Sequence, residues 1–239
     1  MARLARLAVA GLPHYVLQMT VHGQPLAPAA DDRLALLDAL GAATRQHGVA
    51  VWGYALLAQG LHLLLCPAQA ASLGQAMQTL GRRYVPGYNR RHQRSGALWS
   101  SRFRATVVEP GERVLTAMCQ IDSLASAEGA PSSAAHHVGQ HADPLLQDPP
   151  SLWALGNTPF ERETAYRRRL EAGVDAAAGE ALARAVHGGW AFGSPAFVAQ
   201  VAQAAGRPAA PRRPGRPSRP AGAGSSDMAP IKGRRDTYP

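Results

Sequence analysis

A single histidine, His62, begins an apolar run whose residue types are typical of a buried strand. The segment from residue 54 to 65 reads YALLAQGLHLLL. An imidazole here suits three roles: a catalytic residue, a hydrogen-bonded histidine of the core, or the remaining half of a pair that has lost its partner. The isolation of His62 favours the core role, so residues elsewhere in the chain must distinguish between the three.

A second segment, Gly81–Arg104, has residue types that bind nucleic acid. It reads GRRYVPGYNRRHQRSGALWSSRFR, with seven arginines and no acid. Arginine forks bind phosphates and aromatic rings stack on exposed bases, which predicts contacts with single-stranded or hairpin nucleic acid. The predicted DNA-binding residues are Arg82, Arg83, Tyr84, Tyr88, Asn89, Arg90, Arg91, His92, Arg94, Trp99, Arg102 and Arg104. An amphipathic helix with Tyr84 and Tyr88 in the core explains the two tyrosines equally well, whereas the arginines lack an acid nearby to pair with.

The strands and helices that position these residues alternate along the chain. Strands are predicted over 12–23, 49–58, 61–67 and 102–109, and helices over 31–48, 73–93 and 111–126. Gln59-Gly60 is expected to form the turn between the middle strands, and Pro86 to kink or end the second helix at Val85. The order β-α-β-β-α-β-α predicts an α+β, ferredoxin-like antiparallel sheet with its helices on one face and one appended helix.

The rest of the chain predicts a helical extension and a basic tail. An extended link over 130–151 precedes helices at 159–171, 175–187 and 194–205, after which proline and arginine dominate. The tail is expected to be disordered because it cannot bury enough apolar surface. The predicted domains are therefore a DNA-binding domain at 1–130, a helical extension at 131–205 and a tail at 206–239.

Charge and cysteine content indicate which class of partner the protein binds and in which cellular compartment it works. The net charge of +9 and the pI of about 10.5 favour a polyanionic partner. Only two cysteines, Cys66 and Cys119, are present, which suits a reducing cytoplasm. No apolar run approaches the length of a membrane span, so no membrane partner is expected.

The arginine-rich segment resembles the signature of the REP-associated tyrosine transposases, relatives of insertion-sequence transposases of the HUH endonuclease class. Their pattern is close to R-Y-x-x-x-[FY]-N-R-R-H-x-R-x-G-x-L-W-x-x-R-F-R, and the chain matches it through Arg104. The resemblance extends over about residues 1–205. It implies a bacterial DNA-binding protein of DNA transposition, with hairpin or single-stranded DNA lying along the sheet and the arginine-rich segment. The resemblance also implies that two copies of the chain form a homodimer.

The same resemblance implies a catalytic set that this chain does not complete. Family members bind Mg²⁺ or Mn²⁺ through an H-x-H motif and an Asn or Gln, and a tyrosine attacks the scissile phosphate. His62 matches the second histidine, as a remnant metal ligand, and Gly60 stands in place of the first. Gln120 takes the tyrosine position and Leu124 the asparagine position. We therefore expect a pseudoenzyme in which no residue is assigned a catalytic role. A divalent metal is expected to bind only if residual activity exists.

Other interpretations remain beside this one. One is an active transposase and single-strand endonuclease that uses substitute residues, and another is an RNA-binding module on a ferredoxin-like sheet. His136, His137 and His141 suggest a polar loop near DNA more than a zinc site, since no cysteine or carboxylate completes a tetrahedral set. In the tail, RRPGRP is similar to an AT-hook core, although nonspecific phosphate binding is the simpler expectation.

Overall fold

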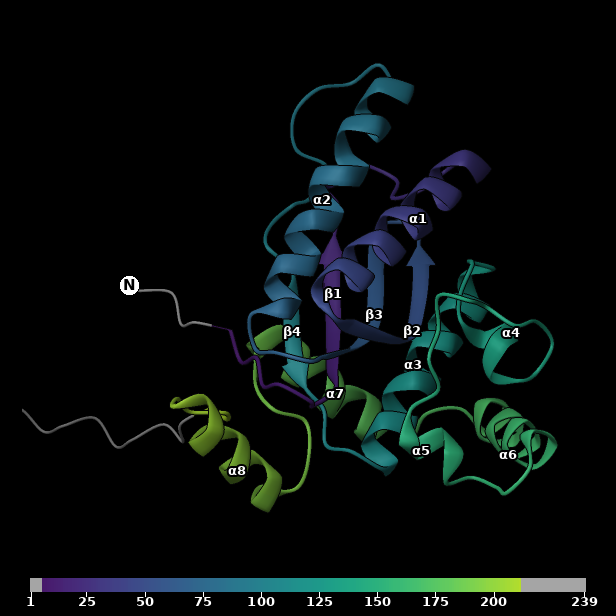
Figure 1. Cartoon of the computed structure of the whole chain (residues 1–239), viewed down its shortest axis with the longest axis vertical. Coiled ribbons are helices and arrows are strands. Elements are labelled where there is room, and N and C mark those ends of the chain that lie inside the picture. Colours follow the sequence, from purple (N-terminus) through teal and green to yellow (C-terminus); the bar gives the residue numbers. More distant parts are fainter. Residues whose placement is uncertain (1–5, 212–239) are drawn as a thin grey trace, which may run out of the picture.

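A four-stranded antiparallel sheet forms the centre of the chain. The structure is a computed structural model, and it describes residues 6–211. The strands are β1 (His14–Met19), β2 (Val49–Leu57), β3 (Gly60–Pro67) and β4 (Arg104–Val107). Their spatial order is β2-β3-β1-β4 with every neighbouring pair antiparallel, which is the predicted ferredoxin-like arrangement (Figure 1).

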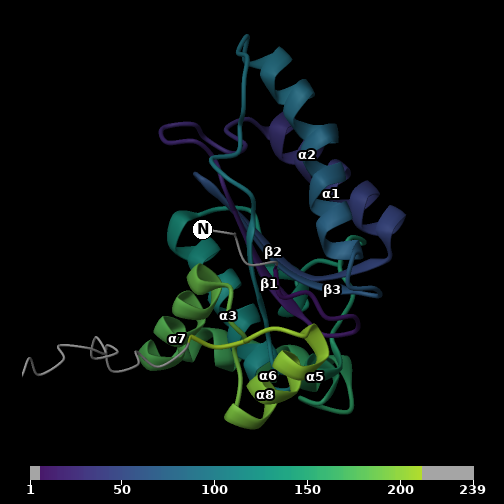
Figure 2. The same ribbon diagram turned by 90° about the vertical axis from the view of Figure 1, so that its left-hand side faces the viewer.

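Helices cover both faces of this sheet. The first face packs against α1 (Ala30–His47) and α2 (Ser72–Arg91), and its core includes Val16, Leu61 and Leu63. The second face packs against α3 (Glu112–Glu128), with Tyr15 and Leu64 in its core. Figure 2 shows α1 and α2 on one side of the strands and α3 on the other. The α+β class is confirmed, but the expectation of helices on one face holds for α1 and α2 only.

The strand period explains why both faces are covered. Successive side chains of a strand point to opposite faces, so a run of leucines is apolar on both sides. Leu61, Leu63 and Leu65 lie in the first cluster, and Leu64 lies in the second. All four side chains are completely buried. The sequence LHLLL therefore requires a helix on each side.

Two local features differ from the expectations. The turn between β2 and β3 consists of Ala58 and Gln59, because Leu57 pairs with Gly60. Helix α2 continues through Pro86 to Arg91 and does not end at Val85. A proline inside a helix removes one backbone hydrogen bond, and the buried tyrosines on both sides of Pro86, Tyr84 and Tyr88, stabilise the helix by tertiary packing.

The segment after α3 packs onto the second face of the sheet. It contains α4 (Ala134–His137), α5 (Pro150–Trp153), α6 (Pro159–Ala172), α7 (Ala176–Gly188) and α8 (Pro195–Ala205). The first two are short helices in the region predicted as an extended link. Residues from α5, α6 and α7 share one apolar cluster with the sheet, so the predicted boundary at 130 separates no distinct cores.

Both outer strands of the sheet are covered by irregular segments. Beside β2, the backbone of Leu56 donates to Pro131 and that of Gln147 donates to Val51. Beside β4, Phe192 forms an isolated parallel bridge with Val108. The chain beyond α8 also closes on this side, because Ala191 donates to the carbonyl of Ala209.

The two ends of the described chain meet beside β4. Leu7, Val107 and Ala209 belong to one small apolar cluster with two residues of α8. The predicted tail thus packs as far as Ala209, while its residues 212–239, with the predicted AT-hook-like sequence, lie outside the described part. Within residues 6–211, no helix combines the length and the hydrophobicity needed to cross a membrane.

Candidate nucleic-acid interface

The outer face of α2 presents cations to solvent. Arg82, Arg83 and Arg90 are exposed. Arg83 and Arg90 are two helical turns apart, so their side chains lie about 10 Å apart along one face. Neither guanidinium has a hydrogen bond or an ion pair within residues 6–211, while Arg82 donates to Thr79 at 3.4 Å. These arginines can contact phosphates without breaking an internal ion pair.

The inner face of α2 buries the two tyrosines. Tyr84 and Tyr88 are 2% and 1% exposed. Their hydroxyls donate to the carbonyls of Leu26 and Pro25 at 2.6 and 2.7 Å, and burial raises the pKa of both phenols. The prediction that these rings stack on bases is wrong for this structure, because no face of either ring reaches solvent. They are core residues with satisfied hydroxyls.

An acid from α1 pairs with the C-terminal turn of α2. The side chain of Asp32 is 1% exposed and lies 2.8 Å from Arg91 Nε and 2.8 Å from His92 Nε2. Burial alone would raise the pKa of this carboxyl, but the hydrogen bonds from Arg91 and His92 outweigh burial and lower it. The expectation that no acid pairs with the arginines is wrong here, since Asp32 is close in space and far in sequence.

The loop after α2 is held by its own polar residues. Arg94 Nη1 donates to Asn89 at 2.8 Å, and Arg94 Nη2 donates to the carbonyl of Ala97. Trp99 is half-buried against α2, where a side chain at Gly81 would lie 3.3 Å from its indole nitrogen. Asn89, Arg94 and Trp99 therefore shape the loop, and the part of each that reaches solvent can still contact a ligand.

Two further predicted arginines lie at the start of β4. Arg102 and Arg104 are exposed. Arg104 Nη1 donates to the carbonyl of His187 at 2.6 Å, while the Arg102 side chain has no hydrogen bond or ion pair within residues 6–211. In the described part of the chain, Arg102 joins Arg83 and Arg90 as a cation whose charge no internal partner offsets.

His62 lies in β3 on the face that packs against α3. Its Nδ1 is 2.6 Å from the hydroxyl of Tyr15, and the two rings meet edge to face. Burial lowers the pKa of His62 to about 4, against a smaller opposing effect of Glu128. The histidine is therefore neutral at physiological pH, and its observed partner is a phenol.

The other positions of the implied catalytic set supply no complementary groups. A Cβ at Gly60 would lie 3.5 Å from His62 Nε2, so the two positions share a face, but glycine carries no donor atom. Gln120 points toward α7, with its Oε1 3.3 Å from where a Cβ of Gly179 would lie. Leu124 packs into the apolar cluster of the second sheet face. Within residues 6–211, no three His, Cys, Asp or Glu side chains could hold a metal ion together.

The donor set at His62 therefore does not fit a hard divalent cation. Mg²⁺ and Mn²⁺ require several oxygen or nitrogen ligands in a defined geometry. One imidazole beside a glycine offers a single ligand. The structure supports the core role that an isolated histidine suggests, and no step of a reaction can be derived through a metal here.

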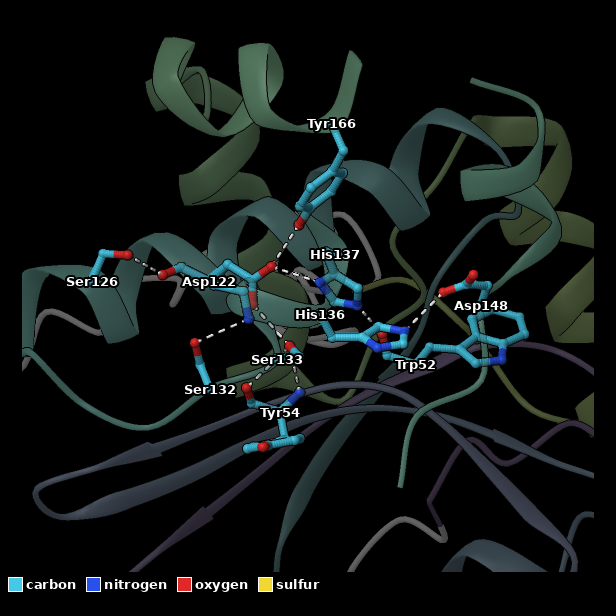
Figure 3. A network of polar contacts seen from close by, with 11 residues as sticks. Trp52, Tyr54, Asp122, Ser126, Ser132, Ser133, His136, His137, Asp148 and Tyr166 are labelled. Carbon is cyan, nitrogen blue, oxygen red and sulfur yellow. Dashed lines mark hydrogen bonds and ion pairs between the residues drawn. The ribbon is translucent and has the colours of Figure 1, made fainter. Parts of the chain in front are cut away.

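A buried polar network around Asp122 of α3 was not predicted from the sequence (Figure 3). Asp122 is completely buried and receives three hydrogen bonds, each of 2.8 Å, from Ser133, His137 and Tyr166. His137 Nε2 also lies 3.0 Å from the carbonyl of Trp52. Both imidazole nitrogens of His137 thus lie within hydrogen-bonding distance of oxygen atoms.

This network contains the residue types of a hydrolase triad in an arrangement that cannot act as one. Ser133 bonds to Asp122 and to the backbone of Tyr54, not to His137. Ser133 and His137 are 1% and 2% exposed, so no substrate reaches them. The network instead joins α3, α4 and α6 to β2. The sequence signal for it is one acid, Asp122, within the apolar stretch of α3.

The remaining histidines of this region take separate roles. His136 lies 3.2 Å from Asp148, and its Nδ1 accepts from the backbone of Asp143. His137 is part of the buried network, and His141 is exposed. The prediction of a polar loop thus fits the contacts, whereas its contact with DNA stays a prediction.

Comparisons with known proteins place the fold beside a DNA-binding transposase. A structure described as a REP-associated tyrosine transposase bound to a REP hairpin superposes with a TM-score of 0.50, at 10% identity. The match covers 63% of this chain and 93% of that one. A structure from Deinococcus radiodurans R1 described as a candidate transposase matches 53% of this chain and 98% of its own, at 19% identity and a TM-score of 0.35. No protein-family model and no curated protein matches the sequence.

Proposed function

We propose that this chain is a transposase-like DNA-binding protein that recognises single-stranded or hairpin DNA and does not cleave it. The observation that carries the proposal is the set of exposed arginines on α2 and before β4, of which Arg83, Arg90 and Arg102 lack any internal counter-charge within residues 6–211. The match between the arginine-rich segment and the transposase signature supports it, as does a fold like that of a hairpin-bound transposase.

The bound DNA is expected on α2 and the segment that follows it. Both sheet faces are covered by helices, so an open sheet platform is not available to lie against DNA. Affinity then depends on phosphate contacts, which release counterions and fall with salt. The same coverage argues against the RNA-binding interpretation, because that mode stacks bases on exposed aromatic residues of a sheet.

The absence of strand cleavage follows from the groups at the four implied positions. Glycine, glutamine and leucine provide neither a second imidazole nor a nucleophile there. A substitute nucleophile would have to come from a nearby tyrosine, and Tyr15 touches His62. Tyr15 is 3% exposed, and burial raises the pKa of its phenol well above the usual range. A buried, protonated phenol cannot attack a phosphate in solution.

Binding and cleavage can be tested on the same samples. A labelled DNA hairpin with a single-stranded flank is incubated with the full chain and Mg²⁺ or Mn²⁺, then resolved on native and denaturing gels. We expect a shifted band, an intact strand and no covalent protein–DNA adduct. Replacing Arg83 and Arg90 with Gln should weaken binding about 10-fold to 100-fold, as expected when charged hydrogen bonds to phosphate are removed.

A control is Arg184→Gln, which removes one charge where the double variant removes two: Arg184 is exposed on α7, and its ion-pair partner within residues 6–211 is Glu180 at 3.1 Å. This change alters the net charge without touching the arginine-rich segment, and it should leave affinity unchanged. Metal-dependent nicking that disappears on His62→Ala or Gln120→Ala would show an active transposase instead. Equal affinity for an RNA hairpin of the same sequence would favour the RNA-binding interpretation.

A further inference from the structure

Asp32 is a buried acid beneath the arginine-rich surface of α2. It lies in the first turn of α1, and its side chain is 1% exposed. Its Oδ1 lies 2.8 Å from Arg91 Nε, and its Oδ2 lies 2.8 Å from His92 Nε2. The backbone nitrogen of Ala29 also donates to Oδ2, at 3.3 Å. Both carboxylate oxygens are thus engaged, which gives the group one defined orientation.

The contact with Asp32 leaves one edge of Arg91 for a ligand. A guanidinium donates from Nε and from both terminal nitrogens, and Asp32 accepts from Nε. The terminal nitrogens, Nη1 and Nη2, make no hydrogen bond or ion pair within residues 6–211. The Arg91 side chain is 33% exposed. The edge formed by Nη1 and Nη2 has the geometry to bind two oxygens of one phosphate.

The surroundings of the pair keep this edge in place. Gly87 lies one turn before Arg91 on α2, and a Cβ there would lie 3.3 Å from Arg91 Nη1. The absence of a side chain at this position leaves room for the guanidinium. At the other oxygen of Asp32, the ring of His92 packs against Tyr88, with 4.4 Å between the ring centres. Arg91 is therefore held at Nε by an acid that is itself fixed by its other partners.

We propose that Asp32 is a positioning residue for DNA binding, which holds Arg91 so that Nη1 and Nη2 contact a phosphate. The inference rests on the proposed function and assigns a role in it to an acid. Asp32 offsets the charge of Arg91, so the pair offers DNA a fixed hydrogen-bonding edge and no net charge. Fixing the guanidinium in advance lowers the entropy lost when a phosphate binds, because a free arginine side chain has many rotamers.

Net charge and positioning predict opposite effects for the loss of Asp32. Burial opposes ionisation of this carboxyl, but the hydrogen bonds from Arg91 and His92 outweigh burial and lower its pKa, so it is charged at neutral pH. Removing the acid raises the net positive charge, which by itself strengthens attraction to a polyanion. Removing the contact releases the Arg91 side chain, which weakens the binding of a phosphate. The direction of the change in affinity therefore distinguishes the two.

The test measures the affinity of the full chain for a labelled DNA hairpin by fluorescence anisotropy. Asp32→Ala removes the acid that holds Arg91. Asp38→Ala is the matched control, because Asp38 is exposed on the same helix and the net charge changes equally. We expect Asp32→Ala to weaken binding about threefold to tenfold, the effect of having to order one long side chain on binding. Asp38→Ala should leave affinity unchanged or slightly higher.

A second variant tests the contact from the other side and leaves the buried acid in place. Arg91→Lys conserves the charge, but an ammonium lacks the planar edge of a guanidinium held at Nε. Binding should weaken by a similar factor. Adding Asp32→Ala to Arg91→Lys should cause little further loss, because residues that act through one contact are not additive. Arg184→Lys, at an exposed arginine of α7, is the control and should not change affinity.

Circular dichroism shows whether each variant is folded. Unchanged or tighter binding by folded Asp32→Ala would overturn the positioning role while leaving DNA binding intact, as would a loss that adds fully to that of Arg91→Lys. If Asp32→Ala does not fold, Arg91→Lys decides alone, and an unchanged affinity of that variant overturns the role. Failure of the wild-type chain to bind the hairpin would overturn the proposed function and this inference with it.

Discussion

Two histidines, one buried and one half-buried, make the stability of the fold sensitive to mild acid. His14 is completely buried, and burial lowers its pKa to about 4, while its Nδ1 lies 2.8 Å from the carbonyl of Leu12. His62 is shifted to about the same value by burial. In the unfolded chain both rings have ordinary pKa values near 6.5, so they bind protons at a pH where the folded chain does not.

The sign of the pH effect follows from this difference. Between about pH 4 and pH 6.5 the unfolded state binds more protons, so the free energy of unfolding rises with pH across that range and is flat above it. The full shift at His14 corresponds to about 3 kcal/mol. Urea unfolding at pH 5, 6 and 7 measures the slope, and His62→Gln should reduce it. An unchanged slope in the variant would show that His62 does not stay neutral in the folded chain.

The residue scale also shows where sequence reasoning fails. Tyr84 and Tyr88 have the types expected of base-stacking residues, and only the helical period distinguishes a core face from a ligand face. The contacts of Asp32 with Arg91 and His92 join residues about sixty positions apart. A scan along the chain cannot detect such a partner, so it overcounted the cations available to DNA.

At the scale of elements, α3 is the scaffold on which the C-terminal half assembles. Its buried Asp122 binds side chains from α4, α6 and the residue before α4. The hydroxyl of Tyr166, from α6, has this carboxylate as its partner, and burial raises the pKa of the phenol, further favouring the protonated donor. The network therefore acts as one unit in which Ser133, His137 and Tyr166 share one acid as a partner.

Asp122→Asn is expected to destabilise the protein by about 3–5 kcal/mol, because it removes the charge that His137 and Tyr166 bind and leaves buried donors without a full acceptor set. The change conserves volume, so loss of packing does not contribute. Chemical denaturation followed by circular dichroism measures it. Asp38→Asn, at an exposed site on α1, is the matched control and should stay within about 0.5 kcal/mol of wild type. A similarly small effect at Asp122 would mean that the network contributes no net stability.

The elements themselves were largely predictable from the sequence. Strand and helix order, and the ends of α1 and α6–α8, follow from apolar periodicity and from terminal glycines such as Gly48 in the left-handed conformation. The short helices α4 and α5 were not predictable, since four residues carry too little periodicity. The passage of α2 through Pro86 depends on tertiary contacts that no local rule includes.

At the scale of the whole molecule, charge is concentrated where DNA is proposed to bind and in the tail. Residues 212–239 contain seven Lys or Arg and two Asp, a net charge of +5. A chain that ends at Pro211 should bind every DNA sequence more weakly, with a smaller salt dependence of log Kd. Competition between hairpin and unrelated DNA should keep its ratio, since phosphate contacts carry no sequence information. Loss of hairpin preference on truncation would instead give the tail a role in recognition.

The segments beside β2 and β4 have a consequence for solubility. An outer strand with unpaired backbone groups is a template on which another chain can add a strand. Here Pro131 and Gln147 occupy the free side of β2, and Phe192 occupies that of β4. The C-terminal half thereby prevents polymerisation of the sheet by strand addition. A shortened form that lacks the residues after 188 would expose the free edge of β4, which Phe192 covers in the full chain.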